Sequence, residues 1–308
     1  NVKTLAAFKE SATAPRLACG SENGKVHVFD AVSGGDALLV LKVGSYVILL
    51  LAFKDVATGA LRLASGSVDN KVRVFDPVAG GEALVVLEGH TDRVMALTAF
   101  TDPATGEPRL VSGSNDVRVW NPAAGGAAIE AEPEGHSQDV SALVTFVDPA
   151  TGALRVATGS IDGSIRVSDA ETGGVLLVID VGSPVRALAF FVDPATGAPR
   201  LGCGTWTDYY GKCGDVRVFD PVTGGEALLV LDVGSGVNAL AFFADPATGA
   251  LRLACGCEGG KVRIFDAGAG GEALVVLEGH TEMVQALGVF EDPATGGLRL
   301  ASGSRDGV

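Results

Sequence analysis

Short apolar runs separated by turn residues recur along the whole chain. Residues 61–87, LRLASGSVDNKVRVFDPVAGGEALVVL, hold three such runs, with a tight turn after the first and a Gly-rich turn before the third. An arginine of this unit returns every 45–52 residues, at Arg16, Arg62, Arg109, Arg155, Arg200, Arg252 and Arg299. A long fixed period in β-rich text indicates a radial repeat architecture.

Each unit offers four strand candidates. The first is apolar almost throughout, as in residues 47–53 and 185–191, which indicates burial on both faces. The others are of the types seen at residues 61–67, 71–75 and 83–87. No segment of useful length shows the 3.6-residue period of a helix. The sequence therefore predicts an all-β chain.

Turn residues at the junctions favour antiparallel hairpins. Asp162-Gly163 and Asp306-Gly307 are preferred in two-residue turns with positive φ. Asp-Pro-Ala-Thr-Gly recurs five times between first and second strands, where Pro presets φ and Gly takes the left-handed conformation. Gly-Gly pairs such as Gly80-Gly81 separate third and fourth strands.

Four antiparallel strands per unit, repeated with apolar faces on both sides, predict blades that pack side by side. We expect a seven-bladed β-propeller of four-stranded antiparallel blades, forming one domain over residues 1–308. The expected blades cover about 1–42, 43–88, 89–132, 133–180, 181–232, 233–278 and, in part, 279–308.

The seventh blade is expected to be incomplete, because the sequence supplies only its first two strands before Val308. The chain also starts directly on a first strand, so its beginning supplies nothing that would complete that blade. An exposed β edge predicts self-association. The simplest interpretation is that the natural protein continues past Val308.

These units resemble the blades of WD-repeat β-propellers over essentially the whole chain. The family pattern has Gly-His before the first strand, present here as Gly89-His90, Gly135-His136 and Gly279-His280. It has Trp-Asp at the end of the third strand, where this chain mostly has Phe-Asp, as at Phe75-Asp76. Only the third unit keeps the Trp, in Trp120-Asn121.

In that family a buried hydrogen-bond network joins the His, a second-strand Ser, a turn Asp and the Trp. The resemblance implies this network only in the third unit, from His90, Ser112, Asp116 and Trp120. The turn that carries Asp116 is two residues shorter than in neighbouring units, so the position of Asp116 is left open. Kelch-type propellers are the alternative family, but their Tyr and Trp partners are missing here.

Composition narrows the function classes. The formal net charge is −14, which argues against nucleic acid as the main ligand, since phosphate binding needs clustered Lys and Arg. No window approaches 18 uninterrupted apolar residues, so no membrane span is expected. The five cysteines and the absence of a signal peptide favour a reducing, intracellular and cytoplasmic location.

We find no pattern for catalysis, a cofactor or a metal. The three Gly-His histidines belong to different units and are expected not to converge, and the Cys255-x-Cys257 pair lacks two further ligands nearby. No nucleophile–base pair and no phosphate-binding loop stand out. The sequence predicts a protein that is not an enzyme and needs no cofactor.

The fifth unit carries the one irregular turn. Ten residues, 206–215, separate its second and third strands where the second unit has four, and they include Trp206, Tyr209 and Tyr210. In a propeller this turn lies on the face of the Gly-His loops, and exposed Trp and Tyr are typical binding anchors. Tyr46 is expected on the same face. The alternative is that these aromatic residues fold back over the blade.

The sequence thus predicts a non-enzymatic scaffold that binds another protein or a peptide on the channel-mouth face, with Trp206, Tyr209, Tyr210 and Tyr46 as candidate partner-binding residues. One alternative is a regulatory or architectural propeller attached to a catalytic module elsewhere in a longer chain. A ligand-binding or hydrolytic propeller is disfavoured, because the first strands lack acidic and His residues.

Overall fold

The fold is all-β. The computed structural model describes residues 2–11, 14–55, 58–102, 105–132, 135–194, 196–206, 214–292 and 295–307. The described residues form 26 strands and no helix, arranged in six four-stranded antiparallel sheets and one two-stranded sheet. In every four-stranded sheet the strands lie in chain order, as expected for a β-propeller built from four-stranded blades.

Contacts divide the chain into two compact units. The first unit contains residues 1–135, 288–303 and 307–308, and the second contains residues 136–287 and 304–306. The two-stranded sheet contributes to both. Each unit is described below by itself.

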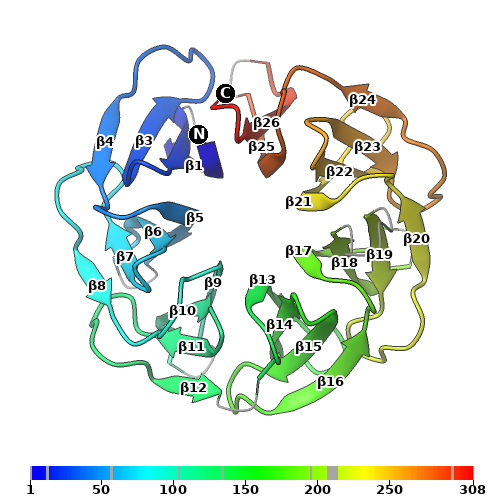
Figure 1. The fold of residues 1–308 in the computed structure, drawn as a ribbon, viewed down its shortest axis with the longest axis horizontal. Helices are drawn as coiled ribbons and strands as arrows, with labels where there is room; N and C mark the ends of the chain where they lie inside the picture. The colour runs from blue at the N-terminus through cyan, green and yellow to red at the C-terminus, as the bar shows by residue number, and fades with distance from the viewer. Residues whose placement is uncertain are drawn as a thin grey trace. The chain divides into compact units, whose positions relative to one another are not determined.

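The first unit holds three complete sheets, of which the second lies between the other two (Figure 1). Its strands are β1 (Val2–Ser11), β2 (Ala14–Ser21), β3 (Lys25–Asp30), β4 (Leu39–Lys42), β5 (Val47–Lys54), β6 (Leu61–Ser67), β7 (Val72–Phe75), β8 (Val85–Leu87), β9 (Ala96–Thr101), β10 (Pro108–Gly113), β11 (Val117–Trp120) and β12 (Glu130–Glu132).

The second unit holds three further sheets in the same arrangement (Figure 1). Its strands are β13 (Val140–Val147), β14 (Leu154–Ser160), β15 (Ser164–Asp169), β16 (Val175–Asp180), β17 (Val185–Val192), β18 (Pro199–Thr205), β19 (Asp215–Phe219), β20 (Leu229–Asp232), β21 (Val237–Ala244), β22 (Leu251–Cys257), β23 (Val262–Asp266) and β24 (Val275–Leu277).

The last sheet pairs β25 (Val284–Glu291) with β26 (Leu298–Ser304). Two strands are present where the other sheets have four. The complete sheets therefore number six among the described residues, and a full count of seven blades stays a proposal.

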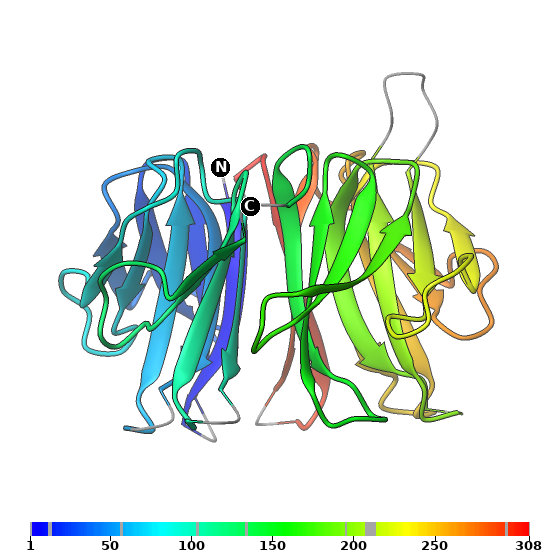
Figure 2. The same ribbon diagram turned by 90° about the horizontal axis from the view of Figure 1, so that it is seen from below.

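The turns form for local reasons. In the fourth sheet the Asp-Pro-Ala-Thr-Gly turn closes through hydrogen bonds from Gly152 N to Asp148 O and from Asp148 N to Ala153 O, both 2.8 Å long. Gly152 has φ of 72°, a conformation that glycine adopts without strain. These turns lie at one end of the strands, and the segments that precede the first strands lie at the other (Figure 2).

Neighbouring sheets are held in register by a glycine in the second strand. A Cβ at Gly66 would lie 2.9 Å from Val94 Cγ1 of the next sheet, and at Gly159 it would lie 2.5 Å from Val185 Cγ1. Both valines are fully buried. The same relation recurs for Gly20, Gly204, Gly256 and Gly303. We call this repeated pairing the Gly–Val contact.

Apolar clusters fill the space between adjacent sheets. One cluster joins Val72 and Leu87 of the second sheet to Leu110 and Trp120 of the third. Another joins Ile165 and Ile179 of the fourth sheet to residues of the fifth, such as Phe219. The first strands alternate between buried and half-buried positions, rather than being buried on both faces as their apolar sequence predicted.

The repeated arginine has a structural partner that the sequence reasoning did not assign. Arg16 pairs with Asp30 at 2.8 Å, and Arg252 pairs with Asp266 at 2.6 Å, so the Asp of Phe-Asp binds the second strand of its own sheet. In the third sheet Asn121 replaces this Asp. There Glu107 approaches Arg109 at 2.7 Å and supplies the charge that Asn121 lacks.

Candidate functional site

The structure brings together all four residues of the expected network in the third sheet. Trp120 Nε1 donates a hydrogen bond to Ser112 Oγ at 2.7 Å, and Ser112 Oγ lies 2.6 Å from His90 Nε2. His90 Nδ1 contacts Asp116 Oδ1. The shortened turn therefore still delivers Asp116 to the histidine. Arg118 binds the other carboxylate oxygen of Asp116 at 2.7 Å.

Burial favours the neutral form of this histidine. Burial lowers the pKa of His90, although the charge of Asp116 acts in the opposite direction. A neutral imidazole next to a carboxylate must carry its proton on Nδ1, so Nε2 accepts from the Ser112 hydroxyl. Each polar atom of the chain Trp120–Ser112–His90–Asp116 then has a complementary partner.

Ser112, His90 and Asp116 are hydrogen-bonded one to the next, an arrangement that also serves nucleophilic catalysis. Here, however, the serine is not accessible to a substrate. Ser112 is fully buried and its oxygen accepts the indole hydrogen of Trp120. A nucleophile needs an exposed oxygen that a substrate can reach. The closed hydrogen bonding of this network therefore fits a structural role in the third sheet.

Two further histidines make related contacts. His136 Nε2 lies 2.7 Å from Thr158 Oγ1, and His136 Nδ1 lies 3.2 Å from Asp162 Oδ2. His280 Nδ1 lies 3.1 Å from Asp306 Oδ2. The His280 pair was missed by the sequence reasoning. The sequence could have identified this pair, because the His and the Asp are separated by 26 residues in all three cases.

Trp206 packs back onto its own unit. The ring is half-buried, the Arg186 guanidinium carbon lies 4.6 Å from its centroid, and a Cβ on Gly236 would collide with it. Trp206 N also donates to Pro184 O at 3.0 Å. The indole thus lies between the starts of β17 and β21. The candidates Tyr209 and Tyr210 lie outside the described residues.

Tyr46 belongs to the first unit. It precedes β5, is half-buried, and donates from its hydroxyl to Glu22 Oε1 at 3.2 Å. Its carbonyl accepts from Val68 N at 3.1 Å. Tyr46 and Trp206 therefore each pack against their own unit.

A third set of positions was missed by the sequence reasoning. The residue after the first-strand Val differs in each of the seven sequence repeats, although the residues around it recur. For example, β17 reads VRALAFFV and β21 reads VNALAFFA. In five of the sheets this residue falls in a register shift, as between Val185 and Ala187. β-Bulges re-aim side chains and are frequent at functional sites. The shifts fall at Lys3, Ile48, Ser141, Arg186 and Asn238; Met95 and Gln285 hold the same sequence position, and we call all seven the bulge residues.

The bulge residues of the second unit are polar. Arg186 covers the Trp206 ring, and the Ser141 hydroxyl donates to the carbonyl of Val185 in β17, the first strand of the following sheet. Within the described part of the chain, Trp206 Nε1 and Asn238 Nδ2 are buried and have no hydrogen-bond partner. Unsatisfied buried donors are costly and need an explanation, such as an acceptor that a ligand supplies.

The cysteines fit a packing role. Burial raises the pKa of Cys19 to about 11 and that of Cys203 to about 12. Cys19, Cys203, Cys255 and Cys257 are free thiols. No group of three or more His, Cys, Asp or Glu side chains within the described ranges could hold a metal ion. Nor does any helix in those ranges have the length and apolar character that a membrane crossing requires.

Comparison with known families supports a WD-repeat β-propeller. Residues 129–169 match the model described as WD domain, G-beta repeat. The match covers most of the fourth sheet, including His136, Thr158 and Asp162. No curated protein matches the chain. The matched repeat and the six four-stranded sheets together support a WD-repeat propeller family for this chain, a class that is typical of protein-interaction scaffolds and generally non-catalytic.

Proposed function

We propose that this chain forms a seven-bladed propeller and is a non-enzymatic scaffold that binds another protein or a peptide. Its binding surface is the end of the sheets where the first strands begin, and its contacts include the bulge residues. The observation that carries the proposal is that the bulge residues differ from one sequence repeat to the next. Where repeats are nearly identical, packing fixes most positions, so a position that differs in every unit serves something other than packing.

Each unit has its own chemistry at the end of its sheets where the first strands begin. Lys3, Ile48 and Met95 make the bulge residues of the first unit largely apolar. Ser141, Arg186, Asn238 and Gln285 make those of the second unit polar. The Arg186 guanidinium over the Trp206 indole and the Asn238 amide are donors of the kind that suit the carbonyl groups of a peptide.

A reducing location in the cytoplasm is part of the same proposal. The four free thiols support it, because disulfides are favoured in secreted domains.

The test uses peptides selected from a random display library against the whole chain. Binding of a selected peptide is measured by fluorescence anisotropy for the unaltered protein and for the Asn238→Ala and Arg186→Ala variants. Loss of a hot-spot donor is expected to weaken binding about tenfold or more. A Val178→Thr variant on the exposed β16 is the control and should bind normally.

The inserted turn is tested separately by replacing Trp206, Tyr209 and Tyr210 with Ala. Weaker binding would place this turn in the interface, and unchanged binding would assign it a structural role. If selected peptides bind the Asn238→Ala and Arg186→Ala variants as tightly as the unaltered protein, the bulge residues do not form the surface.

A further inference from the structure

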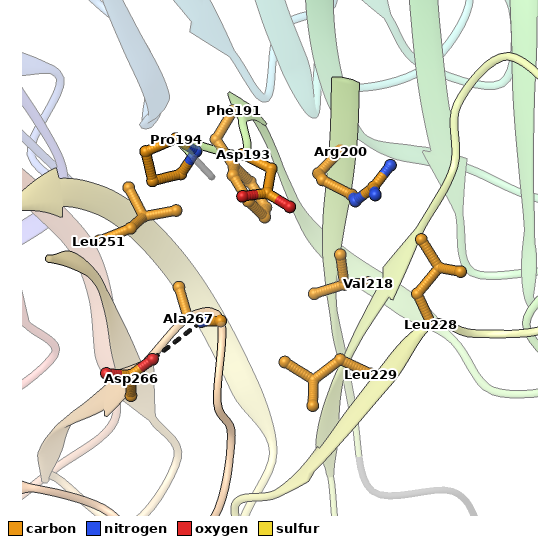
Figure 3. A pocket seen from close by; sticks show the side chains of 11 residues that line it. Phe191, Asp193, Pro194, Arg200, Val218, Leu228, Leu229, Leu251, Asp266 and Ala267 are labelled. Carbon is orange, nitrogen blue, oxygen red and sulfur yellow. Dashed lines mark hydrogen bonds between the residues drawn. The ribbon is translucent and has the colours of Figure 1, made fainter. Parts of the chain in front are cut away.

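A cavity of about 290 Å³ opens between the fifth and sixth sheets, inside the second unit. Its lining combines polar and apolar surface, and the apolar part includes Phe191, Leu229 and Leu251 (Figure 3). Asp193 and Arg200 line one side of it. The cavity is near the turns that follow the first and third strands, so it is remote from the bulge residues along the same strands.

The equivalent place in the first unit is nearly closed. A cavity of only about 20 Å³ lies there, lined by Phe53, Asp55 and Arg62 of the second sheet and by Pro108, Pro122 and Ala123 of the third. Ala267 and Gly268 occupy the positions of Pro122 and Ala123 in the sixth sheet. The loss of these side-chain atoms opens the space between the fifth and sixth sheets.

Nothing in the backbone requires a glycine at position 268. Gly268 does not have a positive φ, and a Cβ there would meet only the side chain of Asp266, at an ordinary 3.6 Å. The corresponding residues after the third strands of the second and fifth sheets are Val78 and Val222. The glycine therefore contributes free volume at this cavity and no turn geometry.

Arg200 lacks the close ion pairs of Arg252 and resembles Arg62, which lies 3.6 Å from Asp76 and donates to Leu61 O. Arg252 makes ion pairs with Asp266 at 2.6 Å and with Asp245 at 3.3 Å. Arg200 has a longer separation of 3.9 Å from Asp220, and it donates one hydrogen bond of 2.9 Å to Pro199 O. Its guanidinium has five N–H groups, so it retains donors for a ligand.

The fourth strand of the fifth sheet forms the rim. β20 is the outermost strand of its sheet, and Leu228, the residue directly before it, is 56% exposed and lines the cavity. Val230 on the same strand is 55% exposed. An open strand edge with exposed apolar side chains is a template for an added strand.

We propose that this cavity binds an extended peptide segment, which lies along β20 and inserts one large apolar side chain between the fifth and sixth sheets. Arg200 donates to a carbonyl of the peptide and Asp193 accepts from one of its N–H groups. A volume of about 290 Å³ is at the low end for ligand sites, which suits one side chain better than a larger molecule. This site is separate from the surface proposed above.

The proposal is tested by methyl NMR with two capped pentapeptides, acetyl-TVLVT-amide and acetyl-TVAVT-amide, added to the full chain. The leucine peptide is expected to shift the methyl signals of Leu228, Leu229 and Leu251. The alanine peptide should bind about tenfold more weakly or not at all, since it buries three fewer carbon atoms. Free leucine added alone is expected to leave these signals unchanged.

Gly268→Val fills the cavity with a side chain that sister units tolerate, and it should abolish these shifts. Ala123→Val is the matched control in the first unit, where the cavity is already closed, and should leave the shifts unchanged. Arg200→Gln should weaken binding while the fold is retained.

Three results would overturn the proposal: no shifts with the leucine peptide, equal shifts in the Gly268→Val variant, or shifts produced by free leucine alone. The Asn238→Ala and Arg186→Ala variants should keep this binding. Failure at one site is therefore distinguishable from failure at the other.

Discussion

Ser112 and Ser65 occupy equivalent positions in neighbouring sheets, yet their removal should have opposite consequences. Both side chains are fully buried. Ser112 Oγ accepts from Trp120 Nε1 and hydrogen-bonds to His90 Nε2. Ser65 Oγ is buried with no hydrogen-bond partner in the described part of the chain, and Phe75 takes the place of the Trp.

Ser112→Ala would leave two buried polar groups, an indole N–H and an imidazole nitrogen, without a partner. Each such group costs about 1–3 kcal/mol, so the variant should lose about 2–5 kcal/mol of unfolding free energy. Ser65→Ala removes a hydroxyl that is itself unsatisfied, so it should be neutral or stabilise the protein by up to about 1 kcal/mol. The presence of Cys at this position in Cys19, Cys203 and Cys255 indicates that a small apolar side chain fits.

The two variants are compared by urea unfolding, with hydrogen exchange of the β10 and β11 amides as a local measure, because repeat proteins need not unfold in one step. Ser112→Ala should shift the midpoint strongly and increase exchange in these strands. Equal destabilisation by the two variants would refute the reasoning, since it would mean that the hydroxyls are energetically alike.

Two further predictions concern pH and packing. Burial lowers the pKa of His90 and of His136, so the unfolded chain binds protons more readily than the folded one. The free energy of unfolding should therefore fall as the pH drops below the ordinary histidine pKa of about 6.5. Urea midpoints at pH 7.5 and 5.5 measure this fall, and a variant with Gln at both positions should lose the pH dependence. Gly159→Ala would press a methyl group against Val185 and should cost about 1–3 kcal/mol in thermal unfolding, whereas Gly259→Ala, which has no close neighbour, should cost much less; equal losses would exclude the Gly–Val contact as the cause.

The fold was readable from the sequence because its signals are local and repeated. The alternation of apolar runs with Asp-Gly, Asp-Pro and Gly-Gly turns predicted the strands and their antiparallel order. The resemblance to WD-repeat blades also pointed to His90, Ser112 and Trp120, whereas the position of Asp116 was left open because its turn is two residues shorter than in neighbouring repeats. The pair of His280 and Asp306 had the same spacing and could have been found by the same comparison.

The candidate sites were harder to predict, because they depend on contacts between neighbouring sheets. The packing of Trp206 depends on Gly236 and Arg186, which lie in other segments of the chain. The cavity beside Gly268 becomes visible only when the volumes between neighbouring sheets are compared. Periodicity reports which face a side chain takes within its own sheet, but it does not report how much room the next sheet leaves.

The Gly–Val contact has a consequence for how such a chain can evolve. In six of the described sheets a glycine acts as a socket for a valine, the plug, of a neighbouring sheet, so these repeats can follow one another without a redesigned junction. A duplicated unit is then accommodated as soon as it is made, which explains why near-copies coexist in one chain. The bulge residue beside this valine is then free to vary. A new copy can therefore acquire a new binding specificity while the positions that hold the sheets together stay unchanged.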